Sequence, residues 1–216
     1  MISAVRLQLP RIYPITNTAV SGLTHTEQVA HLLRGGATFI QLREKTNSPR
    51  AFFDDAESAV HLARAAGAAI IINDRVDLAL ALGASGVHLG QTDMPVNAAR
   101  QLLGPDAIIG YSTHNLDQVV EALELPINYL AFGPIFPTRT KENPDPIAGV
   151  DGLRAAKTLA GELPVVAIGG IDESNMADIF TAGADSAAII SGILSNAQNI
   201  AANLRKMMRA GSQQPR

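Results

Sequence analysis

The sequence predicts a (β/α)8 barrel, in which eight parallel strands alternate with helices around one core. Eight short runs rich in β-branched residues alternate with Ala- and Leu-rich stretches along the 216 residues, and eight such units close this barrel. The runs are apolar throughout, which indicates strands buried on both faces of a parallel sheet. Hydrophobic residues make up 47% of the chain and aromatic residues only 4%, as is typical of α/β proteins. A doubly wound open sheet is the alternative.

The expected elements follow one another in regular order. We expect strands over 11–16, 38–42, 69–73, 86–89, 107–112, 128–133, 164–169 and 185–190. We expect helices that begin near Thr26, Pro49, Val76, Val96, Asn115, Asp151, Glu173 and Asn196. Pro14 removes a hydrogen-bond donor from the first strand, so the assignment and boundaries of this strand have the weakest support of the eight. In this prediction residues 1–216 form a single domain, of which 211–216 are a disordered tail.

Composition and charge narrow the function. The chain has no cysteine, which excludes disulfides, thiolate metal sites and cysteine nucleophiles. Its formal net charge is -3, and Lys and Arg form no cluster, so we expect small-molecule partners and neither nucleic acid nor membrane. No apolar run reaches the roughly 18 residues of a membrane span, and Arg6, Pro10 and Arg11 interrupt any export signal. These features predict a soluble cytoplasmic protein of undetermined oligomeric state.

Two acids follow neighbouring strands of the predicted barrel. Active sites of such barrels form at the carboxyl ends of the strands, and Asp74 and Asp93 come just after the third and fourth runs. Adjacent strands lie about 4.8 Å apart, so the two carboxylates can approach one point and repel. Mg²⁺ relieves this repulsion and accepts substrate phosphate oxygens as further ligands, so we predict a magnesium site here. In the structural alternative, Asp74 caps the next helix and Asp93 begins a turn before Pro95.

The end of the second strand carries groups suited to phosphate. Gln41, Arg43 and Lys45 alternate along the chain, so on an extended backbone their side chains point to the same side. This side would form a cationic surface for a phosphorylated substrate. The alternative is a solvated strand end in which Glu44 is the local partner.

The segment 134–152 is longer than the usual connection between a strand and a helix, which favours a functional or a disordered loop. It contains Thr138, Thr140 and Lys141, two hydroxyls and a positive charge that suit a polyphosphate. A proline-stiffened surface turn is the alternative.

The last two strands end in glycine and serine. Gly169 and Gly170 follow the seventh run, and 190–192 (ISG) follow the eighth. Barrels of this kind commonly bind phosphate there, through backbone N–H groups and a short helix. The histidines receive no role: we expect His25, His31 and His61 to be exposed and His88 to be a core residue with satisfied hydrogen bonds. His114 either contacts a substrate or begins the next helix.

Together these strings resemble the thiamine phosphate synthase family. The resemblance rests on 41–45 (QLREK), 72–75 (INDR), 87–93 (VHLGQTD), 110–114 (GYSTH), 133–136 (GPIF) with 140–141 (TK), and 166–171 (VAIGGI), and it spans about 11–194. It implies a transferase that joins 4-amino-5-hydroxymethyl-2-methylpyrimidine diphosphate to a thiazole phosphate, carboxylated or not. The products are thiamine phosphate and diphosphate. The family's reaction is dissociative: diphosphate leaves first, and the thiazole nitrogen captures the pyrimidine methylene cation.

The resemblance also implies a role for particular residues. The acids Asp74 and Asp93 would bind Mg²⁺, and Arg43, Ser112 and Lys141 would act at the reacting groups. The pyrimidine diphosphate would be held by Gln41, Leu42, Arg43, Glu44, Lys45, Asn73, Ser112 and Lys141. The thiazole phosphate would be held by Thr138, Arg139, Thr140, Gly170, Ile190 and Ser191.

Two other functions remain open at this point. A thiazole tautomerase of the same superfamily would share the barrel and the thiazole phosphate site but handle no diphosphate, and it would not need Gln41, Lys141 and both acids together. A barrel that binds phosphate without catalysis, as a sensor, could keep Gly170 and Ser191 but would not need the metal pair.

Overall fold

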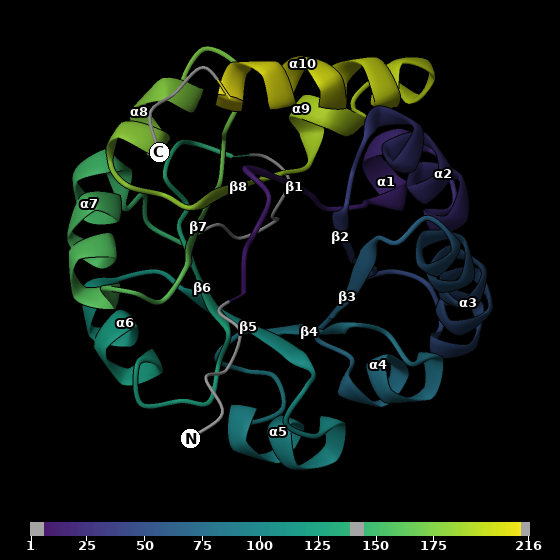
Figure 1. Cartoon of the computed structure of the whole chain (residues 1–216), viewed down its shortest axis with the longest axis horizontal. Coiled ribbons are helices and arrows are strands. Elements are labelled where there is room, and N and C mark those ends of the chain that lie inside the picture. The colour runs from purple at the N-terminus through teal and green to yellow at the C-terminus, as the bar shows by residue number, and fades with distance from the viewer. Residues whose placement is uncertain (1–6, 139–144, 213–216) are drawn as a thin grey trace.

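The structure is a computed structural model that describes residues 7–138 and 145–212. Within these ranges eight parallel strands form the predicted barrel, and the helices surround it (Figure 1). From β2 to β8 each strand pairs with the next along the chain, and β1 pairs with β8. The strands are β1 (Ile12–Pro14), β2 (Phe39–Leu42), β3 (Ala69–Asn73), β4 (Gly86–Leu89), β5 (Ile108–Thr113), β6 (Tyr129–Phe132), β7 (Val165–Ile168) and β8 (Ser186–Ile189). The open-sheet alternative is therefore wrong.

The barrel closes between β1 and β2 through a short contact. Ile15 forms an isolated bridge with Gln41, and the Thr16 N–H donates to the Gln41 carbonyl at 2.8 Å. Pro14 has no N–H to offer, which explains why the first strand is only three residues long. The observed strand is shorter than the 11–16 that we expected.

The eight predicted helices are present, with shifts at several ends. They are α2 (His25–Gly35), α3 (Pro49–Ala65), α4 (Val76–Leu82), α5 (Val96–Leu103), α6 (Leu116–Ala122), α7 (Gly149–Ala160), α8 (Met176–Thr181) and α10 (Ile200–Ser212). The last two begin later than expected: Asn175 precedes α8, and Asn196 caps the 3-10 turn η1 (Ala197–Asn199). Two four-residue helices were not assigned from the sequence, α1 (Thr18–Ser21) and α9 (Ser191–Leu194).

The chain end corrects one boundary. Gly211 and Ser212, which we expected to start the disordered tail, are the last two residues of α10. Gly211 is buried there because the helix approaches β1: a Cβ on this glycine would lie 3.3 Å from Ile12 Cδ1 and 3.4 Å from Phe180 Cε2. Residues 213–216 lie outside the described residues. None of the helices in the described ranges has the length and apolar character to cross a membrane.

The core has two layers because alternate strand residues face opposite ways. One layer fills the space between strands and helices with aliphatic residues such as Leu42, Ile72 and Val87. The other fills the barrel interior and contains Tyr13, Phe39, Tyr129 and smaller aliphatic residues. These aromatic rings meet edge to face, with centroids 4.8 Å apart for Tyr13 and Phe39. Of these three, Tyr13 also lines the cavity described next.

Candidate active site

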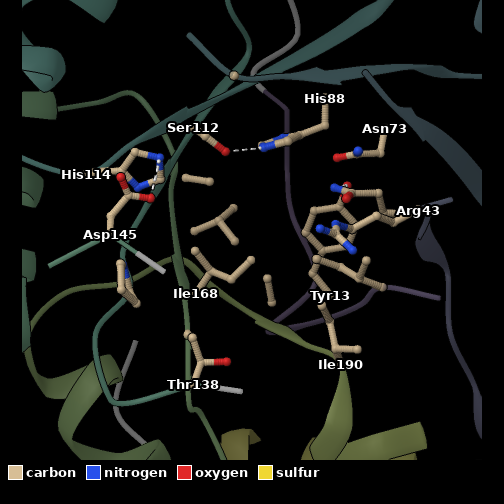
Figure 2. Close-up of a pocket in the computed structure, with 18 of the residues that line it drawn as sticks. Tyr13, Arg43, Asn73, His88, Ser112, His114, Thr138, Asp145, Ile168 and Ile190 are labelled. Atoms are coloured by element: carbon tan, nitrogen blue, oxygen red, sulfur yellow. Dashed lines mark hydrogen bonds and ion pairs between the residues drawn. The ribbon is translucent and has the colours of Figure 1, made fainter. Parts of the chain in front are cut away.

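A cavity of about 320 Å³ opens at the carboxyl ends of the strands, where the barrel fold predicts an active site. Residues at the ends of all eight strands line it. Figure 2 shows Arg43 and Asn73 on one side and His114 and Asp145 on the other, with Thr138 and Ile190 toward the same end of the view. The two sides come from different halves of the barrel, so the cavity can hold two ligand groups at once.

Asp74 and Asp93 meet at the ends of β3 and β4, as predicted. The two carboxyls lie next to each other at the cavity, and the Asp93 carboxylate accepts a hydrogen bond from the Gly90 N–H at 2.7 Å. Burial raises the pKa of Asp93, and the neighbouring Asp74 raises it further. Asp74 has φ +62°, a conformation that few residues other than glycine adopt. This turn directs its carboxylate back toward the cavity.

The structural alternative for these acids finds no support at Asp74. The residue at the N-cap of α4 is Arg75, and no side chain caps that helix. Asp93 does stabilise its own turn through Gly90. Its contact with Asp74, however, is a feature of the cavity and not of the turn.

Two cations lie beside the acids. The Lys45 ammonium forms an ion pair with Asp74. Arg43 is largely buried, which lowers its pKa, while Asp74 and Glu44 work to raise it. Both side chains line the cavity together with Gln41 and Asn73. The predicted cationic surface at the end of β2 therefore exists in the structure.

Glu44 and Leu42 have other roles than the predicted ones. The Leu42 side chain is fully buried in the layer between strands and helices, because it alternates with Gln41. The Glu44 carboxylate accepts from the N–H groups of Lys45 and Thr46 at 2.7 Å and of Asn47 at 3.1 Å. Neither side chain lines the cavity, so the structure does not bring these two predicted residues together with the others.

His25 is buried, not exposed as we expected. Its Nδ1 lies 2.7 Å from the Thr16 hydroxyl and its Nε2 lies 3.3 Å from Glu44. Burial works to raise the pKa of Glu44, but the hydrogen bonds from Thr46, Asn47 and His25 outweigh it and bring the pKa to about 2. Glu44 is thus a fixed anion that shapes the turn carrying Arg43 and Lys45.

The opposite wall consists of backbone and small side chains. Gly169 and Gly170 have φ +103° and +64°, and a Cβ on Gly170 would lie 2.5 Å from the Pro137 carbonyl. Only glycine therefore permits the loop after β6 to pack against the end of β7. Ser191 begins α9 and lines the cavity beside Ile190.

The histidines at the cavity have defined partners. His88 hydrogen-bonds the hydroxyls of Tyr129 and Ser112 at 2.9 and 2.8 Å, as Figure 2 shows for Ser112. Burial lowers its pKa to about 4, which confirms the expected core residue with satisfied hydrogen bonds. His114 Nδ1 donates to the Gly133 carbonyl at 2.6 Å, and its Nε2 lies 3.5 Å from Asp145.

The cavity gathers most of the predicted site. The predicted residues that line it are Gln41, Arg43, Lys45, Asn73, Asp74, Asp93, Ser112, Thr138, Gly170, Ile190 and Ser191. Arg139, Thr140 and Lys141 lie outside the described residues. The sequence interpretation missed Tyr13 and Asp145 as lining residues and assigned no role to His88. It left His114 open between a substrate contact and a helix start, and His114 lines the cavity. Alternation could have placed Tyr13, which faces the interior as Gln41 does.

The fold and the cavity at the carboxyl ends of the strands together define a class of protein. A (β/α)8 barrel that combines paired acids and cations on one wall with glycines and a serine on the other is a phosphate-handling barrel enzyme. The sequence model of the thiamine monophosphate synthase family matches residues 12–193. The chain belongs to this family.

Individual relatives agree. The chain is 44% identical over 202 residues to a thiamine-phosphate synthase of Albidiferax ferrireducens, covering 93% of this chain and 92% of the relative. It is 42% identical over 198 residues to one of Chloroflexus aurantiacus, covering 91% and 90%. Among solved structures, a thiamine phosphate pyrophosphorylase from Pyrococcus furiosus superposes with a TM-score of 0.84 at 33% identity, covering 94% of this chain and 96% of that one.

Proposed function

We propose that this enzyme condenses a pyrimidine diphosphate with a thiazole phosphate to give thiamine phosphate and diphosphate. The observation that carries the proposal is the contact of Asp74 with Asp93 beside Arg43 and Lys45, in the same cavity as Gly170 and Ser191. One wall suits a diphosphate with its metal ion, and the other suits a monophosphate. The family and its relatives support the same pair of substrates.

In the reaction, the bond between the pyrimidine methylene carbon and the diphosphate oxygen breaks, and its electron pair leaves with the diphosphate. The lone pair of the thiazole nitrogen then forms the new bond to carbon. No proton is transferred in either step. The protein therefore has to stabilise a departing anion more than to supply an acid or a base.

The two acids fit Mg²⁺. Two carboxyls in contact, one of them with a raised pKa, are relieved by a hard divalent cation that takes one or two carboxylates and substrate oxygens. Within the described residues no group of three or more acid, His or Cys side chains gathers around a metal position, so the ion would rely on the substrate for further ligands. When bound, the ion would neutralise charge on the leaving diphosphate.

Side chains of the protein supply the remaining contacts to the two substrates. Arg43 and Lys45 face the diphosphate as cations, and Ser112 and Asn73 supply hydrogen bonds. Thr138, Gly170 and Ser191 hold the thiazole phosphate. The sequence adds Arg139 and Thr140 to this side and Lys141 to the diphosphate side. Apolar residues such as Ala131, Val166 and Ile168 lie between the walls and keep water from the pyrimidine methylene cation.

A thiazole tautomerase is the weaker candidate. It handles no diphosphate and has no use for the acid pair together with Arg43 and Lys45. A sensor without catalysis would not need the acids either. A cytoplasmic location belongs to the proposal, because the substrates are multiply charged phosphate esters that do not cross a bilayer unaided.

The test is direct. The purified protein is mixed with both substrates and Mg²⁺, and the formation of thiamine phosphate and diphosphate is followed. We expect the two products in equal amounts, and neither when Mg²⁺ is chelated. Binding of both substrates without any product would contradict the proposal and leave the sensor.

A further inference from the structure

A continuous chain of hydrogen-bonded side chains crosses the barrel interior. Gln41 Nε2 donates to Tyr13 Oη at 3.0 Å, and Tyr13 Oη lies 3.0 Å from Tyr129 Oη. Tyr129 Oη lies 2.9 Å from His88 Nδ1, and His88 Nε2 lies 2.8 Å from Ser112 Oγ. The five residues come from five different strands, β2, β1, β6, β4 and β5. This series of hydrogen bonds therefore connects two sides of the cavity through the barrel interior.

The fold makes room for this chain. Tyr13 and Tyr129 are almost completely buried, and a Cβ on Gly110 would lie only 2.3 Å from Tyr129 Oη and 2.0 Å from its Cζ. Glycine at this point of β5 is thus required for the Tyr129 hydroxyl to reach His88. Gln41 and Ser112, the first and last residues of this hydrogen-bonded series, both line the cavity.

Counting hydrogens gives the chain a direction. Each tyrosine hydroxyl has one hydrogen, and a buried imidazole between two hydroxyls has one. If all four links form and neither buried tyrosine hydrogen is left without an acceptor, every hydrogen must point the same way along these links. With the Gln41 amide nitrogen as the first donor, Tyr13 donates to Tyr129, Tyr129 donates to His88 Nδ1, and His88 Nε2–H donates to Ser112.

This direction has consequences at the two ends. The hydrogen of the Ser112 hydroxyl is not used within the chain and can be donated into the cavity. The Gln41 amide oxygen is likewise left to accept from the cavity. In the reverse direction the ends would exchange roles: Ser112 would offer only lone pairs, and Gln41 would offer its amide hydrogens.

We propose that Tyr13, Tyr129 and His88 are positioning residues that fix Ser112 as a hydrogen-bond donor and the Gln41 oxygen as an acceptor toward the first substrate. The inference rests on the proposed function, because it matches the polarity of an aminopyrimidine diphosphate. Its diphosphate has only acceptor oxygens and gains from the Ser112 donor as charge develops. Its exocyclic amine is a donor and gains from the Gln41 oxygen.

The direction can be measured without substrates. Nitrogen-15 NMR of the ring nitrogens distinguishes the two neutral histidine tautomers, and the His88 signals are assigned by their loss in His88→Gln. We expect His88 Nε2 to carry the hydrogen and Nδ1 to be bare. A hydrogen on Nδ1 would overturn the inference, whatever reaction the enzyme catalyses.

The consequence for substrate is measured by kinetics. Tyr129→Phe interrupts the chain, and we expect kcat/KM for the pyrimidine diphosphate to fall about 10- to 100-fold, the usual effect of removing a group that orients a ligand-binding side chain. The KM for the thiazole phosphate should stay the same. Tyr111→Phe is the matched control, because Tyr111 lies on β5 outside the chain; its kinetics should not change.

A double-mutant cycle separates positioning from general damage. If Tyr129 acts through Ser112, the double variant Tyr129→Phe/Ser112→Ala should lose no more activity than Ser112→Ala alone. Losses that multiply would overturn the inference, while absence of turnover in the wild type would instead overturn the proposed function. Should Tyr129→Phe fail to fold, Tyr13→Phe interrupts the same chain one link earlier and takes its place in the cycle.

Discussion

The carboxyl of Asp93 lies against the carboxyl of Asp74 across the ends of two adjacent strands. Such a contact requires a proton between the groups or a cation beside them, and burial raises the pKa of Asp93 accordingly. Lys45 supplies one positive charge at Asp74. A divalent cation between the two carboxyls would relieve their repulsion, so the pair is the feature on which metal binding and activity depend.

The first prediction concerns the removal of one acid. Asp93→Ala should abolish turnover and Mg²⁺ binding, because one carboxylate and Lys45 remain where the ion would sit. Binding of the thiazole phosphate, measured by calorimetry, should be spared. Asp106→Ala is the control, since this exposed residue precedes β5 at the opposite end of the barrel. Unchanged turnover in Asp93→Ala would remove the metal assignment.

The second prediction concerns pH and Mg²⁺. Because the pKa of Asp93 is raised, protons compete with the metal at higher pH than they would at an ordinary aspartate. The Mg²⁺ concentration needed for half-maximal activity should therefore rise as the pH is lowered from 8 toward 5, by more than the substrate's own affinity for the ion explains. A pH-independent requirement over this range would show that Asp93 does not exchange a proton for the ion.

The third prediction concerns Glu44. The folded pKa of about 2 lies below the ordinary value of 4.5 for a glutamate. The ionised group therefore stabilises the fold fully above about pH 4.5 and loses this contribution as the pH falls toward 2. Glu44→Gln should lower the free energy of unfolding at pH 7 by on the order of 1.5 to 3 kcal/mol, the scale of hydrogen bonds to a charged group. The difference from wild type should shrink at pH 2.5.

Urea unfolding at both values of pH measures this effect, with the exposed Glu124→Gln as control. Glu44→Gln should also raise the KM for the pyrimidine diphosphate, because the turn presents Arg43 and Lys45. An equal loss of stability at pH 7 and pH 2.5 would mean that the charge of Glu44 is not what holds the turn.

The sequence was sufficient for the barrel because periodicity is a local property. Continuous apolar runs predict buried parallel strands, and the strand order places Asp74 next to Asp93 without any knowledge of side-chain positions. The same reasoning explains why Gly170 and Ser191 were found. Both residues follow a recognisable strand, and the barrel fold places the carboxyl ends of all its strands around one cavity.

Contacts between distant residues were beyond the sequence. His25 precedes an outer helix and was expected in solvent, but Thr16 and Glu44 enclose it. The family resemblance implied that Glu44 contacts substrate, whereas its carboxylate accepts hydrogen bonds from the turn that follows it. The number of backbone N–H groups that a turn directs at a carboxylate depends on φ and ψ angles, which composition does not reveal. Likewise, nothing local indicates that Asp74 adopts φ +62°.

The last prediction concerns Gly170, where two costs of a side chain can be separated. Gly170→Ala places a methyl group 2.5 Å from the Pro137 carbonyl and 2.8 Å from Phe136 Cβ, in addition to strain at φ +64°. Gly67→Ala meets the same strain at φ +70° but has nothing within 4 Å of the new Cβ. Strain alone costs roughly 1 to 2 kcal/mol, and overpacking adds about 1 to 3 kcal/mol. We therefore expect Gly170→Ala to lower the free energy of unfolding by more than Gly67→Ala, and only Gly170→Ala to raise the KM for the thiazole phosphate. Equal losses of stability with unchanged KM would show that the loop after β6 yields freely and that Gly170 has no part in holding the phosphate.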